Sequence, residues 1–263
     1  MNYFKPKDIQ EALDLKSSQK KSVFLAGGTN LNSIQYISNN PGALISLENL
    51  NLASIRKNYI GSMATLEEIR INKLLPASIR TAAAHIVNRN IRNIATIGGN
   101  IASNKSSSDM IGVLIALDAV LEYYTLKKEK KNAPVSAWIQ KPAGLITAIK
   151  IPEQGKIIYQ RRFSRTKNDI PLLKLTAGYK ITGDRVNKII IAAGCVAPKI
   201  ITLDKTSEYL NRTGIKDISI KKLQSIAQSE IFPVRDQRAG AVYKRGLLNA
   251  SLEELAANIQ NEN

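Results

Sequence analysis

Residues 1–50 show short apolar runs separated by an amphipathic stretch. The runs Ser22–Ala26 and Ala43–Leu47 have the length and apolar content of buried strands. Between them, Thr29 or Asn30 suits the cap of a helix that carries apolar residues at helical spacing (Leu31, Ile34 and Ile37). Residues 22–47 are therefore predicted to form a small β-α-β unit. A further helix, capped by Asp8, is predicted to precede it.

The rest of the chain continues as mixed strands and helices. Thr65 to Glu68 reads as a capping box, and Pro76 is suited to start a helix. Further strands are predicted at 55–57, 59–63, 119–125, 145–151, 157–163, 174–181 and 188–194, and further helices at 111–117, 204–211, 217–228 and 236–259. Pro152–Lys156 is the best linker. We therefore expect one domain over 1–153, with lobes of about 1–55 and 56–153, and an α+β domain over 157–263.

Composition restricts the chemistry that the side chains can perform. The 263 residues are 44% hydrophobic and include one cysteine, Cys195, and one histidine, His85. An iron–sulfur cluster needs about four thiolates, and one histidine with one cysteine offers almost nothing from which to build a Ser-His-Asp or tetrahedral metal site. We expect Cys195 to be a buried small hydrophobe and His85 to be structural. Any catalytic power must therefore come from a bound cofactor.

The location and charge of the chain allow several interpretations. No apolar run follows the N-terminus or reaches the ~18 residues of a membrane helix, so we expect a protein of the reducing cytoplasm without a secretory signal. The net charge of +17 is compatible with nucleic-acid binding. However, the basic residues are scattered, aromatics make up only 5%, and the densest cluster, Lys127–Lys131, resembles the tip of a strand-to-strand loop. An acidic partner subunit or a lysine-rich genome explains the charge equally well.

Two glycine pairs carry the most specific chemical signal. Gly27-Gly28 follows the predicted strand at 22–26, and Gly98-Gly99 follows a short apolar run and precedes Asp109. Glycine permits turns through positive φ and a close approach of phosphate to backbone N–H groups, whereas a downstream acid can accept hydrogen bonds from a ribose or an adenine. Neither pair has the spacing of a Rossmann or P-loop motif. We expect both turns to hold the pyrophosphate of one dinucleotide.

These residues belong to a set of segments that resembles a known family. The order and spacing of the segments hold over nearly the whole chain, and together they are similar to the FAD-binding medium subunit of the molybdenum hydroxylases, the xanthine dehydrogenase and carbon monoxide dehydrogenase group. The short bacterial xanthine dehydrogenase-like members look most similar. The matching segments are Phe24–Leu31, Ile60–Thr65, Ile91–Asn100 with Asp109 and Ala116–Ala119, Gly194–Pro198 and Asp236–Arg245.

The resemblance implies a fold and a set of cofactor contacts. The fold would be α+β: a two-lobed α/β FAD-binding domain of the PCMH/VAO-like type, then a smaller α+β domain of the CO dehydrogenase flavoprotein type. Asp109 would bind the ribose or adenine end of FAD, with a helix cap as its alternative role, Thr65 would lie near the cofactor, and Arg161 stands where the family often has a lysine that reaches the flavin ring. The pyrophosphate would be held by Leu25, Ala26, Gly27, Gly28, Thr29, Asn30, Leu31, Thr96, Ile97, Gly98, Gly99 and Asn100.

The chain also departs from the pattern of the family. Asn30 replaces a frequent aspartate, Ala64 a frequent threonine and Gly112 a common proline, and the loop Ser103–Ser108 is more polar than usual. These departures are compatible with weaker binding of FAD, or with a loop at 103–108 that becomes ordered only when a partner binds.

The resemblance further implies an electron relay within a complex. A molybdenum-cofactor subunit would oxidise the substrate, an iron–sulfur subunit would pass electrons to FAD, and NAD or another acceptor would receive them. The chain would supply no catalytic side chain and no metal ligand of its own. A stand-alone flavin oxidase and a non-catalytic basic protein that binds nucleic acid remain as alternatives.

Overall fold

The computed structural model describes residues 1–32, 41–152 and 155–262. The chain forms two compact units, Met1–Ser103 with Ala119–Pro152 and Asn104–Asp118 with Glu153–Asn263. Residues 104–118 thus pack with the C-terminal residues although they precede the predicted linker. The expected domain boundary at 153–157 stays a prediction. Among the helices in the described part of the chain, none combines the length and apolar character needed to cross a bilayer.

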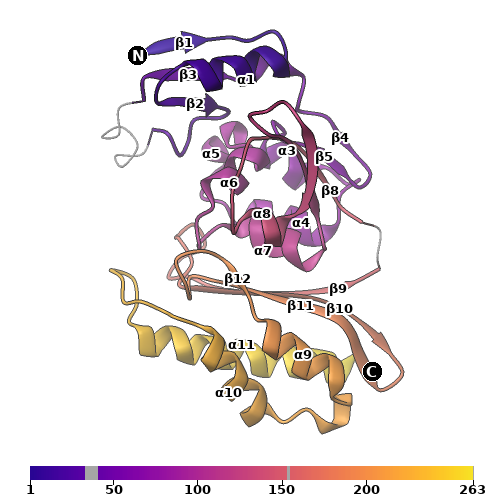
Figure 1. Ribbon diagram of the computed structural model, residues 1–263. Helices are drawn as coiled ribbons and strands as arrows, with labels where there is room; N and C mark the ends of the chain where they lie inside the picture. Colours follow the sequence, from indigo (N-terminus) through magenta and orange to yellow (C-terminus); the bar gives the residue numbers. More distant parts are fainter. Residues whose placement is uncertain (33–40, 153–154, 263) are drawn as a thin grey trace. The chain divides into compact units, whose positions relative to one another are not determined.

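The first unit contains two sheets (Figure 1). A parallel sheet has the order β1-β3-β2, and a second, five-stranded sheet has the order β4-β5-β8-β6-β7 with antiparallel pairs. The strands are β1 (Asn2–Phe4), β2 (Ser22–Leu25), β3 (Ala43–Ser46), β4 (Ile55–Arg56), β5 (Tyr59–Gly61), β6 (Val120–Tyr124), β7 (Lys130–Pro134) and β8 (Leu145–Lys150). The helices are α1 (Ile9–Ser18), η1 (Glu48–Leu50), α3 (Leu66–Ile71), α4 (Ala77–Ala84), α5 (Arg89–Ile94), α6 (Ile97–Ser103) and α8 (Val135–Trp138).

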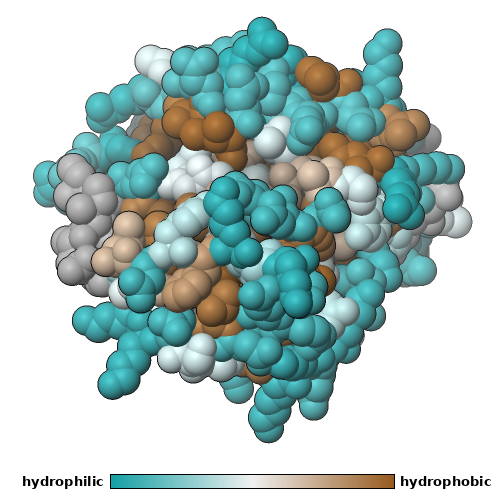
Figure 2. Space-filling model, turned by 90° about the horizontal axis from the view of Figure 1, so that it is seen from above, coloured by the Kyte–Doolittle hydropathy of each residue, from teal (hydrophilic) through white to brown (hydrophobic). Residues whose placement is uncertain are grey.

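Local hydrogen bonds explain where several of these helices begin. The carboxylate of Asp8 accepts from the amide of Glu11 at 2.8 Å at the start of α1, which confirms the predicted cap. Thr65 and Glu68 form the predicted capping box of α3. The helix expected at Leu31–Ile37 lies largely outside the described residues, and Thr29 to Asn32 form a turn. The surface seen from the side of β1 and α1 is mostly hydrophilic, with scattered apolar residues (Figure 2).

The second unit is an antiparallel sheet with helices on both faces (Figure 1). The strand order is β12-β11-β10-β9, with β9 (Ile157–Phe163), β10 (Leu173–Thr182), β11 (Arg185–Gly194) and β12 (Ile201–Thr202). Helix α7 (Asp109–Ala116) packs on β10 and β11 from one side. The other side carries α9 (Asp204–Arg212), α10 (Ile220–Glu230) and α11 (Ala241–Asn261), and the 3-10 helix η2 (Ile215–Asp217) follows α9. The sequence predicts that this last helix begins at 236, but α11 begins at Ala241.

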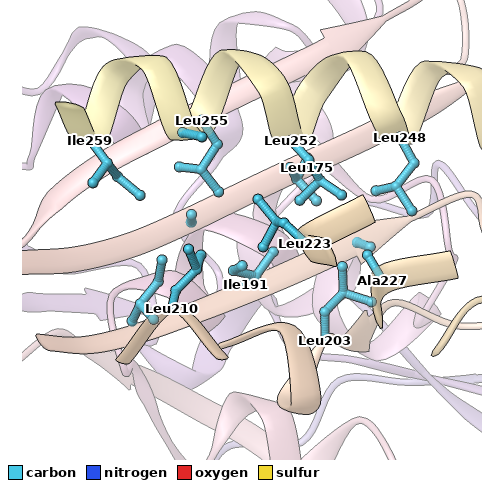
Figure 3. Close-up of a cluster of buried hydrophobic side chains, with 14 of the residues drawn as sticks. Leu175, Ile191, Leu203, Leu210, Leu223, Ala227, Leu248, Leu252, Leu255 and Ile259 are labelled. Atoms are coloured by element: carbon cyan, nitrogen blue, oxygen red, sulfur yellow. The ribbon is translucent and has the colours of Figure 1, made fainter. Parts of the chain in front are cut away.

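The side chains of β10 alternate between these two helical layers. Leu173, Leu175 and Ala177 join the hydrophobic core under α11, which also contains Leu248, Leu252 and Leu255 (Figure 3). The residues between them, Lys174 and Thr176, therefore face α7. Gly178 also faces α7, and a Cβ there would lie 2.0 Å from the carbonyl oxygen of Ala116. This alternation places polar groups against α7, the helix of this unit that precedes the linker in sequence.

Candidate functional site

The first glycine pair forms a loop at the end of an edge strand. Strand β2 ends at Leu25, whose carbonyl accepts from the amide of Leu47 at 2.9 Å. Gly28 has φ of +69°, and its carbonyl accepts from the amide of Asn32 at 3.0 Å. Within the described residues, the backbone amides of Gly27 through Asn30 have no hydrogen-bond acceptor. The loop therefore presents consecutive N–H donors, an arrangement that suits an anion.

The two glycine segments lie against each other in the first unit. A Cβ on Gly27 would lie 1.6 Å from the carbonyl oxygen of Ile94, so only glycine allows the two backbones to approach this closely. A Cβ on Gly99 would lie 3.9 Å from that of Ala26. The structure thus brings together the two predicted pyrophosphate segments, which are far apart in sequence.

The second glycine pair, Gly98-Gly99, lies in the first helical turn of α6 and does not form a loop between two elements. Thr96 precedes α6, and its hydroxyl oxygen accepts from the amide of Gly99 at 3.1 Å. The amide of Ile97 donates to Ala64 at 3.0 Å and that of Gly98 to Ser62 at 2.8 Å. Our expectation of a positive-φ turn at Gly98-Gly99 is therefore wrong, because neither residue has positive φ. Gly98 instead permits close packing, since its Cβ would lie 2.7 Å from the carbonyl oxygen of Ser62.

Thr65 lies beside this segment, but it also has a structural role. It forms an isolated antiparallel bridge with Thr96. Its amide and its hydroxyl each donate to the Glu68 carboxylate at 2.8 Å. The structure therefore brings Thr65 next to Thr96, and the hydroxyl of Thr65 is already engaged in the cap of α3.

A buried carboxylate that we did not single out from the sequence connects α3 to α5. The Glu67 side chain is 8% exposed and accepts from Arg70 at 2.6 Å and from Arg92 at 2.7 Å. Hydrogen bonds from these two guanidinium groups lower the pKa of Glu67 to about 2. Arg92 also donates to the carbonyl of Ile86 at 3.1 Å. Glu67 therefore positions α5, the helix whose last residue, Ile94, contacts Gly27.

Asp109 belongs to the second unit, where its carboxylate is buried between two cations. It lies 3.0 Å from Lys174 Nζ and 3.3 Å from Arg162 Nε, and the three side chains are at most 10% exposed. Burial lowers the pKa of Lys174, although the nearby Asp109 opposes that effect. The cap of α7 is Ser108, which accepts from the amide of Ile111 at 3.2 Å, so the alternative of a capping role for Asp109 is wrong. Its contact with the adenosine half of FAD stays a prediction.

Arg161 points to the other face of the sheet from Asp109. Its cross-strand neighbour is Leu175, a residue of the α11 core, whereas Arg162 pairs with Lys174. The Arg161 guanidinium lies 3.1 Å from Glu254 and 4.7 Å from the centre of the Phe163 ring. The second unit alone therefore does not bring Arg161 and Asp109 together, and the predicted contact of Arg161 with the flavin ring remains untested.

Cys195 is a buried side chain, as predicted. It is 5% exposed, and burial raises the pKa of its thiol. Its Sγ lies 3.3 Å from the carbonyl oxygen of Pro171. His85 ends α4. Among the described residues, no three His, Cys, Asp or Glu side chains are grouped as a metal site would need.

Comparison with known proteins identifies the family. Residues 1–154 match the FAD binding domain in molybdopterin dehydrogenase, and residues 159–258 match the CO dehydrogenase flavoprotein C-terminal domain. The chain is 28% identical to the uncharacterized protein YgfM of Escherichia coli K12, over 98% of this chain and 96% of YgfM. It is 24% identical to the nicotine 6-hydroxylase medium subunit of Paenarthrobacter nicotinovorans, over 94% and 93% of the two chains.

A solved structure shows the same fold. A chain of the reconstituted CO dehydrogenase from Oligotropha carboxidovorans superposes with a TM-score of 0.85 at 23% identity, over 97% of this chain and 95% of that one. The mixed helix and sheet architecture of both units agrees with the fold class predicted from the sequence. The chain therefore belongs to the FAD-binding domain family of the molybdopterin dehydrogenases and is a flavoprotein oxidoreductase subunit of the molybdenum hydroxylase type.

Proposed function

We propose that the loop after β2 and the start of α6 hold the pyrophosphate of FAD. The observation that carries this proposal is the contact between Gly27 and Ile94. It places the amides of Gly27 to Asn30, which have no acceptor among the described residues, beside the segment that contains Thr96. Such amides are suited to phosphate oxygens. Because the amides of Ile97 and Gly98 already have backbone acceptors, the loop after β2 supplies most of the backbone donors.

The remaining predicted residues would act around this centre. Side chains of Thr29, Asn30, Thr96 and Asn100 would add hydrogen bonds, while Leu25, Ala26, Leu31 and the glycines at 98 and 99 would shape the cradle. Thr65 would lie next to the same cofactor. In the second unit, Asp109 would bind the adenosine end and Arg161 the flavin ring, where a cation stabilises negative charge on the reduced ring.

We further propose that the subunit relays electrons within a complex. Bound FAD exchanges electrons singly or in pairs, which suits a position between one-electron centres and a hydride acceptor. With one cysteine and one histidine the chain lacks the ligands for an iron–sulfur cluster of its own. An iron–sulfur subunit, itself supplied by a molybdenum-cofactor subunit, would therefore deliver its electrons. NAD or another acceptor would receive them. The relative from Paenarthrobacter is named a medium subunit, which supports an assembly of this kind.

The relay can be tested without knowing the substrate. The complex is isolated from its native cells, reduced anaerobically with dithionite and mixed with NAD⁺ or a quinone analogue, while the iron–sulfur spectrum is followed. We expect the clusters to be reoxidised when FAD is present and to stay reduced after FAD has been removed. Equal reoxidation with and without FAD would contradict the relay, as would full dehydrogenase activity of the chain purified alone.

A further inference from the structure

The large apolar side chains that the second unit exposes lie mostly in one segment of the chain. Among its described residues, these are Ile170, Phe232, Val234, Val242 and Tyr243, which are 57% to 85% exposed. The segment 232–243 contains four of them. A hydrogen bond of 3.1 Å from Arg238 Nη1 to the carbonyl of Pro171 links that segment to the residue that follows the fifth, Ile170. We call this set, together with Gly246, the 232–246 surface. Exposed apolar residues scattered singly need no explanation, but a cluster of them does.

The backbone under this surface is held by an ion pair between half-buried Asp236 and buried Lys244. The Asp236 carboxylate accepts from Lys244 Nζ at 2.9 Å, from Arg238 Nη2 at 2.6 Å, and from the amides of Arg238 and Ala239 at 2.9 and 3.1 Å. The Lys244 side chain is 2% exposed, and its Nζ also donates to the carbonyl of Val234 at 3.1 Å. Burial acts to raise the pKa of Asp236, but these donors hold it well below its usual range. Phe232 and Val234 are therefore displayed by an ordered loop, which lowers the entropy cost of binding.

Gly246 provides independent evidence that something approaches this surface. It lies in the interior of the 21-residue helix α11, four residues after Val242 and three after Tyr243, so the three share one face. A Cβ on Gly246 would meet no atom within 4 Å. Glycine costs roughly 1 kcal/mol relative to alanine inside a helix, and the fold of this chain does not require it here. What it leaves is a gap between two exposed apolar side chains, where another backbone can come close.

The charges near the surface indicate what approaches it. Arg165, Lys167 and Arg235 are exposed, against one exposed carboxylate, Asp169. The Arg165 side chain is held there, since it donates to the carbonyl of Arg238 at 3.0 Å. A second copy of this chain would bring the same cations into the contact, and the whole chain carries +17. Opposite charges around an apolar centre favour a different, acidic protein.

We propose that the 232–246 surface is the docking site for a partner subunit of the proposed complex, one that offers an apolar patch bordered by carboxylates. The inference rests on the proposed relay function, because that function requires a partner. It adds the surface and the chemistry of the contact. The motif Asp236–Arg245, to which the flavin site gives no role, thereby acquires one: Asp236 and Lys244 hold the loop, while Val242 and Tyr243 make the contact.

The test compares matched surface variants in the native complex. Tagged Val242→Glu, Gly246→Trp, Gly246→Ala and Leu74→Glu chains are each isolated from cells that make the other subunits. The co-purified polypeptides are identified by peptide mass, and iron, molybdenum and FAD are measured per chain. Leu74 is an exposed apolar residue of the first unit, so its variant controls for an added charge. A glutamate in the first turn of a helix is favourable, so Val242→Glu should fold.

We expect Val242→Glu and Gly246→Trp to reduce the recovered iron and molybdenum about tenfold or more, with FAD content and melting temperature unchanged. Leu74→Glu should keep the parental complex, and Gly246→Ala, which adds only a Cβ to the gap, should reduce the recovered metals less than Gly246→Trp. Parental recovery of the metals with Val242→Glu and Gly246→Trp would overturn the inference, as would loss of a homodimer only, or loss of FAD together with the metals. A parental chain that carries FAD but no metal subunit would overturn the docking site and leave flavin binding intact. A parental chain without either would overturn both.

Discussion

Removing the carboxylate of Asp109 should destabilise the second unit. In Asp109→Ala, Lys174 Nζ loses its carboxylate, and within the described residues it keeps the carbonyl of Ser108 at 2.5 Å as its partner, on a side chain that is 8% exposed. Arg162 is affected less, because it also donates to the hydroxyl of Ser164 at 2.6 Å. Breaking one side of a buried ion pair costs about 3–5 kcal/mol. At about 2–4 °C per kcal/mol for a chain of this size, we expect the melting temperature to fall by roughly 6–20 °C.

The assay is thermal unfolding of the cofactor-free protein followed by circular dichroism. The double variant Asp109→Ala with Lys174→Met serves as the control and should recover most of the loss, because the buried ammonium is gone and Arg162 keeps the hydroxyl of Ser164 as a partner. The direction of the pH effect is also defined. Burial lowers the pKa of Lys174 in the folded state, so the folded protein binds fewer protons below the ordinary value of 10.5. Stability of Asp109→Ala should therefore rise as the pH rises towards that value. An unchanged melting temperature would refute the buried pair.

The same double variant separates stability from cofactor binding. If Asp109 also contacts the adenosine half, the double variant should bind FAD more weakly by roughly 1–3 kcal/mol and lose little affinity for FMN, which lacks that half. Equal losses for FAD and FMN would place Asp109 away from the adenosine end.

Further predictions concern the first unit and the cofactor. Gly27→Ala should weaken FAD binding in titrations by about 1–3 kcal/mol, because its Cβ would lie 1.6 Å from Ile94 O; Gly246→Ala is the matched control, and equal affinities would refute the cradle. Gly98→Val should lower the melting temperature even without FAD, because its side chain would clash with Ser62. An unchanged melting temperature would contradict this packing role and leave phosphate binding as the role of Gly98. The pKa of Glu67 is lowered from 4.5 to about 2, so its contribution to stability is present above pH 4.5 and lost as the pH falls towards 2. The free energy of unfolding of Glu67→Gln, measured with urea, should depend less on pH between 4.5 and 2 than that of the parent. The same pH dependence in both proteins would contradict the ion cluster of Glu67. Acid precipitation should release all flavin to the supernatant, and yellow colour kept in the pellet would indicate a covalent bond.

Local patterns predicted the elements whose stability is local. The Asp8 cap and the Thr65–Glu68 capping box are confirmed, because each involves residues within one helical turn. The long strands β10 and β11 also lie where apolar residues predicted them. Strands β1 and β12 were missed, because Asn2–Phe4 and Ile201–Thr202 are too short to show a period. Helix α11 starts later than predicted, because Asp236 and Lys244 hold the preceding loop in place.

The sequence by itself indicated the family and, through that resemblance, the FAD cofactor. It also predicted the two segments that meet in the first unit, because glycine pairs after apolar runs can be recognised without a structure. Only the tertiary structure decided what each residue does there. Gly98 and Gly99 lie in the first turn of a helix despite the poor helix propensity of glycine. Their amides donate hydrogen bonds to the carbonyl of Ser62 and the hydroxyl of Thr96. Asp109 is buried between Arg162 and Lys174 because α7 packs on β10. Partners brought together by packing lie far apart in the sequence, and no local pattern specifies them.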